Sequence, residues 1–166
     1  FKLVMDIFND AWSRNWGFIP FTNAELTHMA KGLKPLLDPT WTAVAEYEGQ
    51  AVAFAILLPN LNEVIRDFNG SLFPFNWARM LWRLKRGVRS GRVPLMGVRR
   101  KFAGTPRGAL LPFLLVDAGA SAARRLGYQR AELSWILEDN RPMNHILRAA
   151  GAGVYKTYRI YEKALA

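Results

Sequence analysis

The sequence predicts an α/β domain built around one mixed β-sheet. A length of 166 residues suits a single domain. Segments whose apolar residues recur at helical spacing alternate with short apolar segments that are typical of strands. The predicted order is two helices, a hairpin, an insert, and then strand, loop, helix, strand, helix and strand, which is typical of an α/β fold.

The first predicted elements are two helices and a β-hairpin. Residues 3–12 place apolar side chains on one side at helical spacing. Asn23 can accept hydrogen bonds from the free N–H groups of a first helical turn, so we expect a second helix to begin there. Two apolar runs, 41–47 and 51–58, are joined by Glu48-Gly49-Gln50, which is the pattern of a hairpin.

The region of about 60–90 is predicted to be a helical insert. Asn60 with Glu63 resembles a capping box for a short helix, and Asn76 can cap another helix that reaches about residue 86. The second of these helices is amphipathic, with arginines opposite its apolar face. The apolar face consists of Trp77, Met80, Leu81, Leu84 and Val88, and the opposite face carries Arg79, Arg83 and Arg86.

The second half of the chain alternates strands and helices. Residues 93–98 form a predicted strand, and a loop rich in Gly, Pro and Arg leads from it to a helix over about 107–126. We expect a continuous apolar strand over 131–137 and a helix that begins at Asn140. Residues 154–161 alternate between apolar and polar side chains, which predicts a half-buried last strand.

The net charge of +10 comes from one stretch of the chain. Ten of the 23 Lys and Arg residues lie between positions 79 and 107, where none of the 13 acidic residues occurs. A local positive field implies an anionic partner, which could be a phosphorylated cofactor, a nucleic acid, an acidic protein or a lipid surface. A solvated helix face followed by a loop gives the same pattern, and the sequence leaves both interpretations open.

Composition excludes several classes of protein. Cysteine is absent, so there are no disulfides and no thiolate metal sites. With His28 and His145 as its only histidines, the chain is not expected to hold a metal ion. No apolar run is long enough to predict a transmembrane segment. Because the chain begins at Phe1 and lacks the pattern of a signal peptide, we expect a cytoplasmic domain cut from a longer protein.

Residues 96–111 carry the most informative pattern, in which a strand leads into a glycine-containing loop and then into a helix. The first turn of a helix presents free N–H groups and a partial positive charge, and glycines let the backbone approach a phosphate. The sequence therefore predicts a pyrophosphate site, although an ordinary strand–helix turn is the alternative. The pattern is neither a Walker loop nor a G-x-G-x-x-G loop.

This segment resembles the signature of the GNAT superfamily of acyl-CoA-dependent N-acetyltransferases. In that signature a strand ends at a Val, which is Val98 here, and Arg/Gln-x-x-Gly-x-Gly/Ala opens the next helix. Ala103 stands at the Arg/Gln position, Pro106 at the first Gly and Gly108 at the second. Gly104 matches a glycine that commonly follows the Arg.

A second GNAT motif is matched in part near the carboxyl end. The motif is Asn-x-x-Ala-x-x-Leu-Tyr-x-x-x-Gly, and Asn140, Met143, Ile146 and Gly151 stand at its Asn, Ala, Leu and Gly. Leu147 takes the place of the tyrosine that often protonates the leaving thiolate. Residues 3–163 look like the C-terminal half of longer bacterial GNAT-like proteins.

The resemblance implies a fold and a co-substrate. The fold is a GNAT-like α/β (α+β) domain over residues 1–166, whose mostly antiparallel sheet is splayed at the centre, with helices on both faces. The co-substrate is acetyl-CoA or another acyl-CoA. Its pantetheine arm would pair with the backbone of Met96, Gly97 and Val98, its thiol end would lie near Asn140, and its pyrophosphate would bind Ala103, Gly104, Thr105, Pro106, Arg107, Gly108 and Ala109.

The expected reaction is direct attack of an amine, on a small molecule or a peptide, on the thioester of the acyl donor. Proton removal needs a base, and Glu138 is the first candidate as a base or substrate anchor. Glu132 and Ser134 share a strand face with Glu138 in the predicted strand. The alternative for Glu138 is a solvated acid near a helix N-terminus, and for Ser134 a buried, hydrogen-bonded serine.

A different class of function stays open beside the enzyme. Ala103 lacks the usual side chain and Pro106 lacks an N–H group, so a catalytically degenerate GNAT domain could instead bind an anionic partner. The partner would be RNA, an acyl carrier protein or a membrane surface, bound at residues 79–89. Trp82, which lies among arginines there, could stack on a base, enter a membrane interface or cover an N-terminal domain of a longer parent protein.

Overall fold

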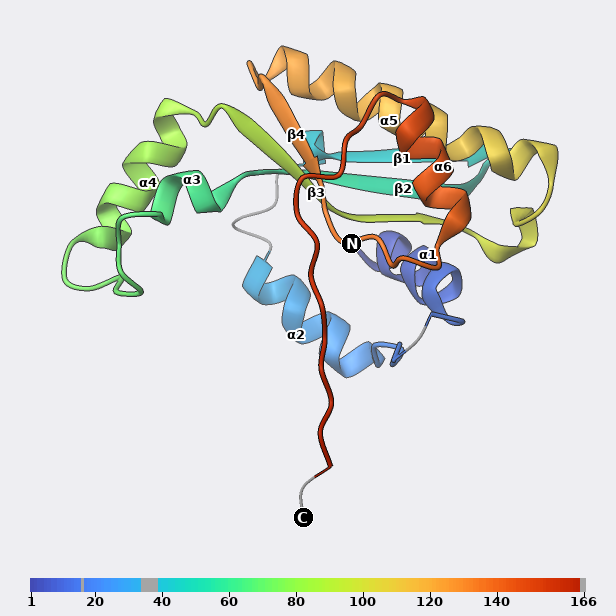
Figure 1. Ribbon diagram of the computed structural model, residues 1–166, viewed down its shortest axis with the longest axis horizontal. Coiled ribbons are helices and arrows are strands. Elements are labelled where there is room, and N and C mark those ends of the chain that lie inside the picture. Colours follow the sequence, from blue (N-terminus) through green and yellow to red (C-terminus); the bar gives the residue numbers. More distant parts are fainter. Residues whose placement is uncertain (16, 34–38, 165–166) are drawn as a thin grey trace. The chain divides into compact units, whose positions relative to one another are not determined.

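The computed structural model describes residues 1–15, 17–33 and 39–164. The chain divides into two compact units, Phe1–Trp135 and Ile136–Ala166, and each is described by itself. The first unit contains the sheet, the insert and most of the helices, and the second contains the last helix and the C-terminal segment (Figure 1).

The sheet of the first unit has four strands in the order β1-β2-β3-β4. These are β1 (Thr42–Tyr47), β2 (Gln50–Pro59), β3 (Ser90–Val98) and β4 (Arg130–Leu133). The pairs β1–β2 and β2–β3 are antiparallel, and β3–β4 is parallel. The prediction of a mixed, mostly antiparallel sheet is confirmed, and the predicted hairpin is β1–β2.

Helices cover both faces of the sheet, as the resemblance implied. On one face α1 (Lys2–Trp12) contacts β2 and β3, and with α2 (Asn23–Leu33) it encloses a core around Ile7, Phe8, Leu26 and Phe54. On the other face α5 (Pro106–Arg125) packs Leu111 and Leu115 on Val52, Ala53 and Ala55. Ala53, Phe54 and Ala55 of β2 therefore supply the two cores in turn, because side chains alternate across a strand.

The first turn of α2 is capped by Thr22 and not by Asn23. The Thr22 hydroxyl accepts a hydrogen bond from the Glu25 amide at 3.3 Å, and the Glu25 carboxylate accepts one from the Thr22 amide at 2.8 Å. This reciprocal pair is a capping box, which satisfies two N–H groups that the helix would otherwise leave free. Asn23 is the first residue inside the helix.

The predicted helical insert is present between β2 and β3. It consists of α3 (Leu61–Ile65), whose first turn Asn60 caps by accepting from Asn62 N, and α4 (Asn76–Arg86). The two helices lie beside each other and extend away from one end of the sheet (Figure 1). Asn76 is the first residue of α4, and its side-chain amide donates to Ser71 O at 2.8 Å.

The strand predicted over 131–137 is shorter than expected. Its ladder with β3 runs from Ser90 opposite Arg130 to Val93 opposite Leu133 and ends there. Trp135 has φ of 38°, which lies outside the extended region that a strand requires. The chain therefore leaves the sheet within two residues of Leu133.

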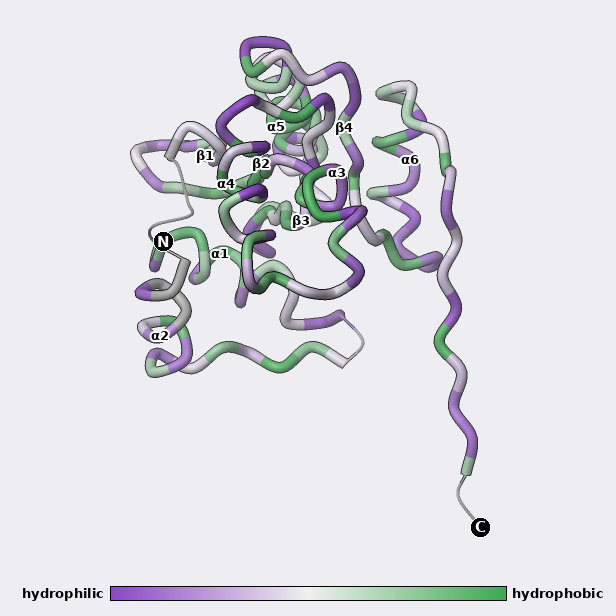
Figure 2. Tube along the Cα trace, turned by 90° about the vertical axis from the view of Figure 1, so that its left-hand side faces the viewer, coloured by the Kyte–Doolittle hydropathy of each residue, from purple (hydrophilic) through white to green (hydrophobic). Residues whose placement is uncertain are grey.

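The second unit contains α6 (Arg141–Ala149), and the strand predicted over 154–161 does not form. Asn140 precedes α6 as its N-cap, as predicted. Residues 152–164 have no regular secondary structure, although hydrophobic and hydrophilic residues alternate along them (Figure 2). Alternation makes a strand only where a neighbouring strand pairs its backbone, and the described residues of this unit supply none.

Candidate functional site

The segment between β3 and α5 has the strand–loop–helix form that the sequence predicts. The chain leaves β3 at Val98, makes one 3-10 turn, and turns back at Gly104, whose φ of 74° favours glycine. Thr105 caps α5: its hydroxyl accepts from Gly108 N at 3.0 Å and donates to Phe102 O at 2.7 Å. These contacts fix the loop against the first turn of the helix.

Few N–H groups of this loop are available to a ligand. Pro106 has no N–H group. The N–H groups of four other residues donate to oxygen atoms of the loop itself, namely Ala103, Thr105, Gly108 and Ala109. Within the described part of the chain, the N–H groups of Gly104 and Arg107 have no acceptor. An anion at this helix N-terminus would therefore meet two free donors and the positive end of the helix dipole.

Gly108 is required by the packing of the loop. A Cβ atom at this position would lie 1.9 Å from Phe102 O and 2.7 Å from Phe102 C, both of which are backbone atoms. Gly97 is restricted in a similar way, since its Cβ would lie 3.0 Å from the Phe54 ring and 3.2 Å from Ala11. Gly97 thus allows β3 to approach α1, and Gly108 allows the first turn of α5 to approach the loop at Phe102.

The basic residues that open the loop contact other parts of the first unit. Arg99 donates to Ala51 O at 3.0 Å and forms an ion pair with Asp6 at 2.6 Å. The Arg100 amide donates to Asp10 at 2.8 Å, and Lys101 donates to the Gln50 side chain at 2.8 Å. These contacts tie the loop to α1 and to the β1–β2 turn, so part of the positive charge has a structural role.

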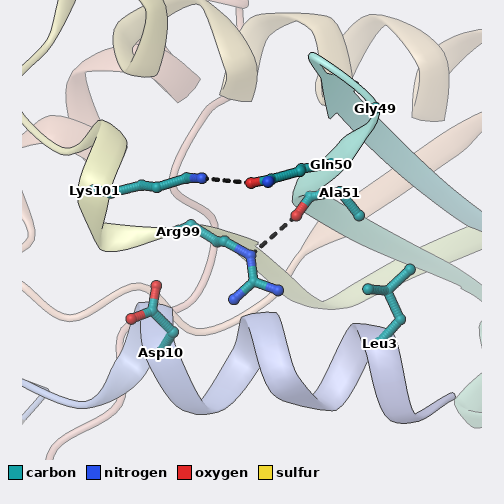
Figure 3. Close-up of a pocket in the computed structure, with 7 residues that line it drawn as sticks. All are labelled: Leu3, Asp10, Gly49, Gln50, Ala51, Arg99 and Lys101. Carbon is teal, nitrogen blue, oxygen red and sulfur yellow. Dashed lines mark hydrogen bonds between the residues drawn. The ribbon is translucent and has the colours of Figure 1, made fainter.

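A polar pocket lies beside the start of the loop (Figure 3). Its volume is about 510 Å³. The lining residues are Leu3, Asp10, Gly49, Gln50, Ala51, Arg99 and Lys101. Figure 3 shows the Arg99 guanidinium between the Ala51 carbonyl and α1, with Lys101 and Gln50 meeting above it. Because Arg99 is paired with Asp6, Lys101 is the lining cation that forms no ion pair with a described residue and is available to an anionic group.

The part of β3 beyond its ladder with β4 has one open edge. Pairing with β4 ends at Val93, whereas pairing with β2 continues to Val98 opposite Ala53. Among the described residues no strand lies along the other edge here, which is the central splay that the resemblance implied. One carbonyl near this edge is engaged, because Trp12 Nε1 donates to Met96 O at 3.3 Å.

Two of the three candidate catalytic residues lie in the first unit and are engaged by neighbours on β3. The Glu132 carboxylate lies 3.6 Å from Arg92 Nη2 and is 18% exposed. The Ser134 hydroxyl donates to Val93 O at 3.2 Å, as a half-buried serine commonly does. Because β4 ends at Leu133, the alternation that placed Glu138 on the same face as these two residues does not continue to it.

The second unit holds Glu138 and Asn140. Glu138 forms an ion pair with Arg159 at 2.7 Å. The Asn140 side chain accepts a hydrogen bond from Met143 N at 3.3 Å and so caps α6. Leu147, at the position of the family's tyrosine, is buried. Each of these residues thus has a structural contact within its own unit.

Sequence reasoning missed the residues that hold the loop from a distance. Asp10 of α1 accepts from the Arg100 amide, and Tyr47 lies under the Arg107 guanidinium, 5.0 Å from ring centre to Cζ. These partners are 90 and 60 positions apart in the chain, and no local pattern links such residues. Among the described residues, no cluster of His, Cys, Asp and Glu could hold a metal ion.

Comparison with solved structures defines the class of fold. The chain matches a probable acetyltransferase with a TM-score of 0.59 at 16% identity, over 99% of this chain and 91% of that one. It matches the aminoglycoside N-acetyltransferase AAC(6')-Iy, bound to a CoA bisubstrate analogue, with a TM-score of 0.57 at 17% identity, over 99% and 94%. The chain has the GNAT acetyltransferase fold.

Two curated relatives are similar in sequence. The Bacterial ceramide synthase of Caulobacter vibrioides is 51% identical over 165 residues, which are 99% of this chain and 43% of that protein. Protein YghO of Escherichia coli K12 is 46% identical over 99% of this chain and 42% of its own length. The chain thus spans less than half the length of these relatives. No protein-family model matches it.

Proposed function

We propose that the chain transfers an acyl group, acetyl or longer, from an acyl-CoA to an amine. The observation that carries the proposal is the β3–α5 junction, where Gly104 and Arg107 have N–H groups with no acceptor among the described residues. These donors stand at the amino end of a 20-residue helix, where a phosphate is stabilised. The acetyltransferase fold and the CoA held by AAC(6')-Iy support the same assignment.

The pantetheine arm of the acyl donor is proposed to lie along the open edge of β3. Backbone groups of Gly97 and Val98 are the partners we propose there, with Asn140 near the thiol end. The Met96 carbonyl is a third proposed partner, and Trp12 Nε1 competes for it by donating to it at 3.3 Å. We therefore expect Trp12→Phe to leave acyl-CoA binding intact or to tighten it.

In the proposed reaction the amine nitrogen attacks the thioester carbonyl carbon. A C–N bond forms, the C–S bond breaks, the CoA thiolate leaves, and the amine gives up a proton to a base. Glu138 and Glu132 are the two carboxylates that we propose for this proton, and Ser134 is proposed to position the acceptor. Each carboxylate has a cationic neighbour, Arg159 and Arg92 respectively.

A lipid amine is the first acceptor to test. The name of the Caulobacter relative, Bacterial ceramide synthase, refers to a lipid product of that protein. The similar region makes up 43% of that protein, and for the present chain we propose only the class of acceptor, a lipid amine. We do not propose that the domain is catalytically degenerate.

Calorimetric titration with acetyl-CoA and a long-chain acyl-CoA tests the binding step, and thiol release in the presence of short and long amines tests turnover. We expect binding of at least one donor and amine-dependent release of CoA. Whichever carboxylate takes the proton, its replacement by glutamine, Glu138→Gln or Glu132→Gln, should lower kcat by about 100-fold or more.

The matched control for these two variants is Glu46→Gln, since Glu46 is an exposed acid on β1. This control should retain the kcat of the unmodified chain. Absence of binding by either donor at millimolar concentration would contradict the proposal. Binding without release of CoA across the amine panel would contradict the transfer step alone.

A further inference from the structure

Helix α4 turns Arg79 and Arg83 toward α3 and leaves Trp77 and Leu81 of its apolar face exposed. Arg83 donates to both the Asp67 carboxylate, at 2.8 Å, and the Val64 carbonyl, at 2.6 Å. Arg79 reaches Asp67 at 3.2 Å, and both guanidinium groups lie within 6 Å of the Phe68 ring centre. No residue of α4 is buried. A helix in a globular domain normally has the opposite orientation, with its apolar stripe inward.

Exposed apolar side chains gather between positions 72 and 82, and we call this set the hairpin tip; Leu61 and Ile65 of α3 are exposed as well. Phe73 and Phe75, in the connection between α3 and α4, are 77% and 74% exposed. Exposed side chains continue on α4 itself. The hairpin tip consists of Leu72, Phe73, Phe75, Trp77, Leu81 and Trp82. An exposed apolar set of this size marks a binding surface in a folded protein.

Cations without an acidic partner precede and follow the hairpin tip along the chain. The side chains of Arg66, Lys85, Arg86 and Arg89 are exposed, and none forms an ion pair with a described residue. The Arg86 guanidinium lies 4.4 Å from the centre of the Trp82 ring. The two acids of the insert are already engaged, Asp67 by arginines and Glu63 by the Ser90 hydroxyl and the Arg89 amide.

We propose that the α3–α4 hairpin docks on a membrane surface that contains anionic lipids. The hairpin tip enters the interface, and the cations that precede and follow it contact lipid phosphates. Aromatic and leucine side chains beside arginines and lysines are the chemistry of interfacial helices, in which apolar burial and charge attraction act together. A nucleic acid matches the charge and the exposed aromatic rings, but it gives the aliphatic side chains of Leu72 and Leu81 no partner, whereas a membrane interface takes up both kinds of apolar side chain. The proposal does not depend on acyl transfer.

Co-sedimentation of the 166-residue chain with vesicles tests this proposal. Vesicles of phosphatidylcholine mixed with phosphatidylglycerol should bind the chain, and vesicles of phosphatidylcholine alone should bind it roughly tenfold more weakly or worse. The variant Phe73→Ser/Phe75→Ser should lose about tenfold or more of the binding to the mixed vesicles. Fluorescence of tryptophan should shift to shorter wavelength on binding, and the shift should be reduced in Trp77→Phe/Trp82→Phe.

The matched control is Ile19→Ser, because Ile19 is 82% exposed but lies between α1 and α2. This variant should bind like the unmodified chain, and all variants should keep the same circular dichroism. Absence of binding to the mixed vesicles overturns the proposal. If Phe73→Ser/Phe75→Ser still binds the mixed vesicles, and RNA competes with that binding, the proposal is overturned in favour of a nucleic-acid surface.

Discussion

Gly108 lies where the first turn of α5 meets the loop, and its lack of a side chain lets them come together. Gly108→Ala would place a Cβ atom 1.9 Å from Phe102 O, so the loop backbone must move. Gly119, also within α5, has open space around its Cβ position. We expect Gly108→Ala to destabilise the fold by roughly 1–3 kcal/mol and Gly119→Ala to stabilise it by about 0.5–1 kcal/mol. Urea unfolding measures both, and equal stability of the two variants would contradict this assignment.

The resemblance assigns Gly108 to a phosphate cradle, which stays a prediction. The structure adds a packing reason for glycine at this position, because a Cβ atom there would meet the Phe102 backbone. The engaged N–H groups of Ala103 and Thr105 could not be predicted. A motif specifies residue types along the chain, but the closing of a loop on itself depends on its three-dimensional path.

Asn140 has a structural role that can be separated from a role in acyl-CoA binding. Asn140→Asp keeps an oxygen that can cap α6 and removes the amide donor, while Asn140→Ala removes both. We expect Asn140→Ala to cost about 1 kcal/mol of stability and Asn140→Asp to cost less. If the amide contacts the donor, acetyl-CoA affinity falls in both variants. Unchanged affinity in Asn140→Asp, by calorimetry, would assign the residue to capping alone.

At the scale of elements, the α3–α4 hairpin depends on one carboxylate. The hydrogen bonds from Arg83 hold the pKa of Asp67 well below its ordinary value of 3.8. A carboxyl whose pKa is lowered in the folded state contributes stability that is present above its unfolded pKa and is lost as the pH falls through the folded value. The hairpin is therefore expected to keep this contribution at neutral pH and to lose it progressively below about pH 4.

Amide hydrogen exchange of α4 measures this effect. Protection in residues 76–86 should fall with acid, relative to the sheet, and Asp67→Asn should show the same low protection already at neutral pH. The matched control is Asp139→Asn, because Asp139 is an exposed acid in the second unit that forms no ion pair with a described residue. Protection of α4 that stays constant in Asp67→Asn would contradict a role for this carboxylate.

Local patterns predicted most elements but not where they end. The helices and the hairpin followed from apolar spacing, because each buries a face whose period is set by its own geometry. The strand over 131–137 ended early because Trp135 takes a positive φ, which no propensity indicates for tryptophan. The strand expected over 154–161 needs a partner to pair its backbone, and pairing is not a local property. Thr22 capped α2 in place of Asn23 because Glu25 lies three residues after it.

At the scale of the whole molecule, the basic residues between positions 79 and 107 divide into those that form ion pairs and those that do not. Of the ten basic residues between positions 79 and 107, Arg79, Arg83, Arg92 and Arg99 form ion pairs with acids from outside that stretch. The other six form none with described residues. Three lie on or just after α4, namely Lys85, Arg86 and Arg89, and three lie between the end of β3 and the first turn of α5, namely Arg100, Lys101 and Arg107. The sequence located the charge, and the structure shows which of these cations are already paired with an acid.

The three unpaired cations near α4 and the three near the start of α5 are predicted to serve different ligands, and removing the charge of each set should separate the two roles. Neutralising Arg100, Lys101 and Arg107 to Gln should weaken acetyl-CoA binding roughly tenfold, because three cations near the proposed phosphate site are lost, and should leave vesicle binding unchanged. Neutralising Lys85, Arg86 and Arg89 to Gln should weaken binding to anionic vesicles by roughly 100-fold and leave acetyl-CoA affinity unchanged. Calorimetry and co-sedimentation on both variants form a matched pair, each serving as the control for the other. If either variant lost both activities in parallel while keeping its fold, the cations would act as one undivided field, and the assignment of separate sites would be wrong.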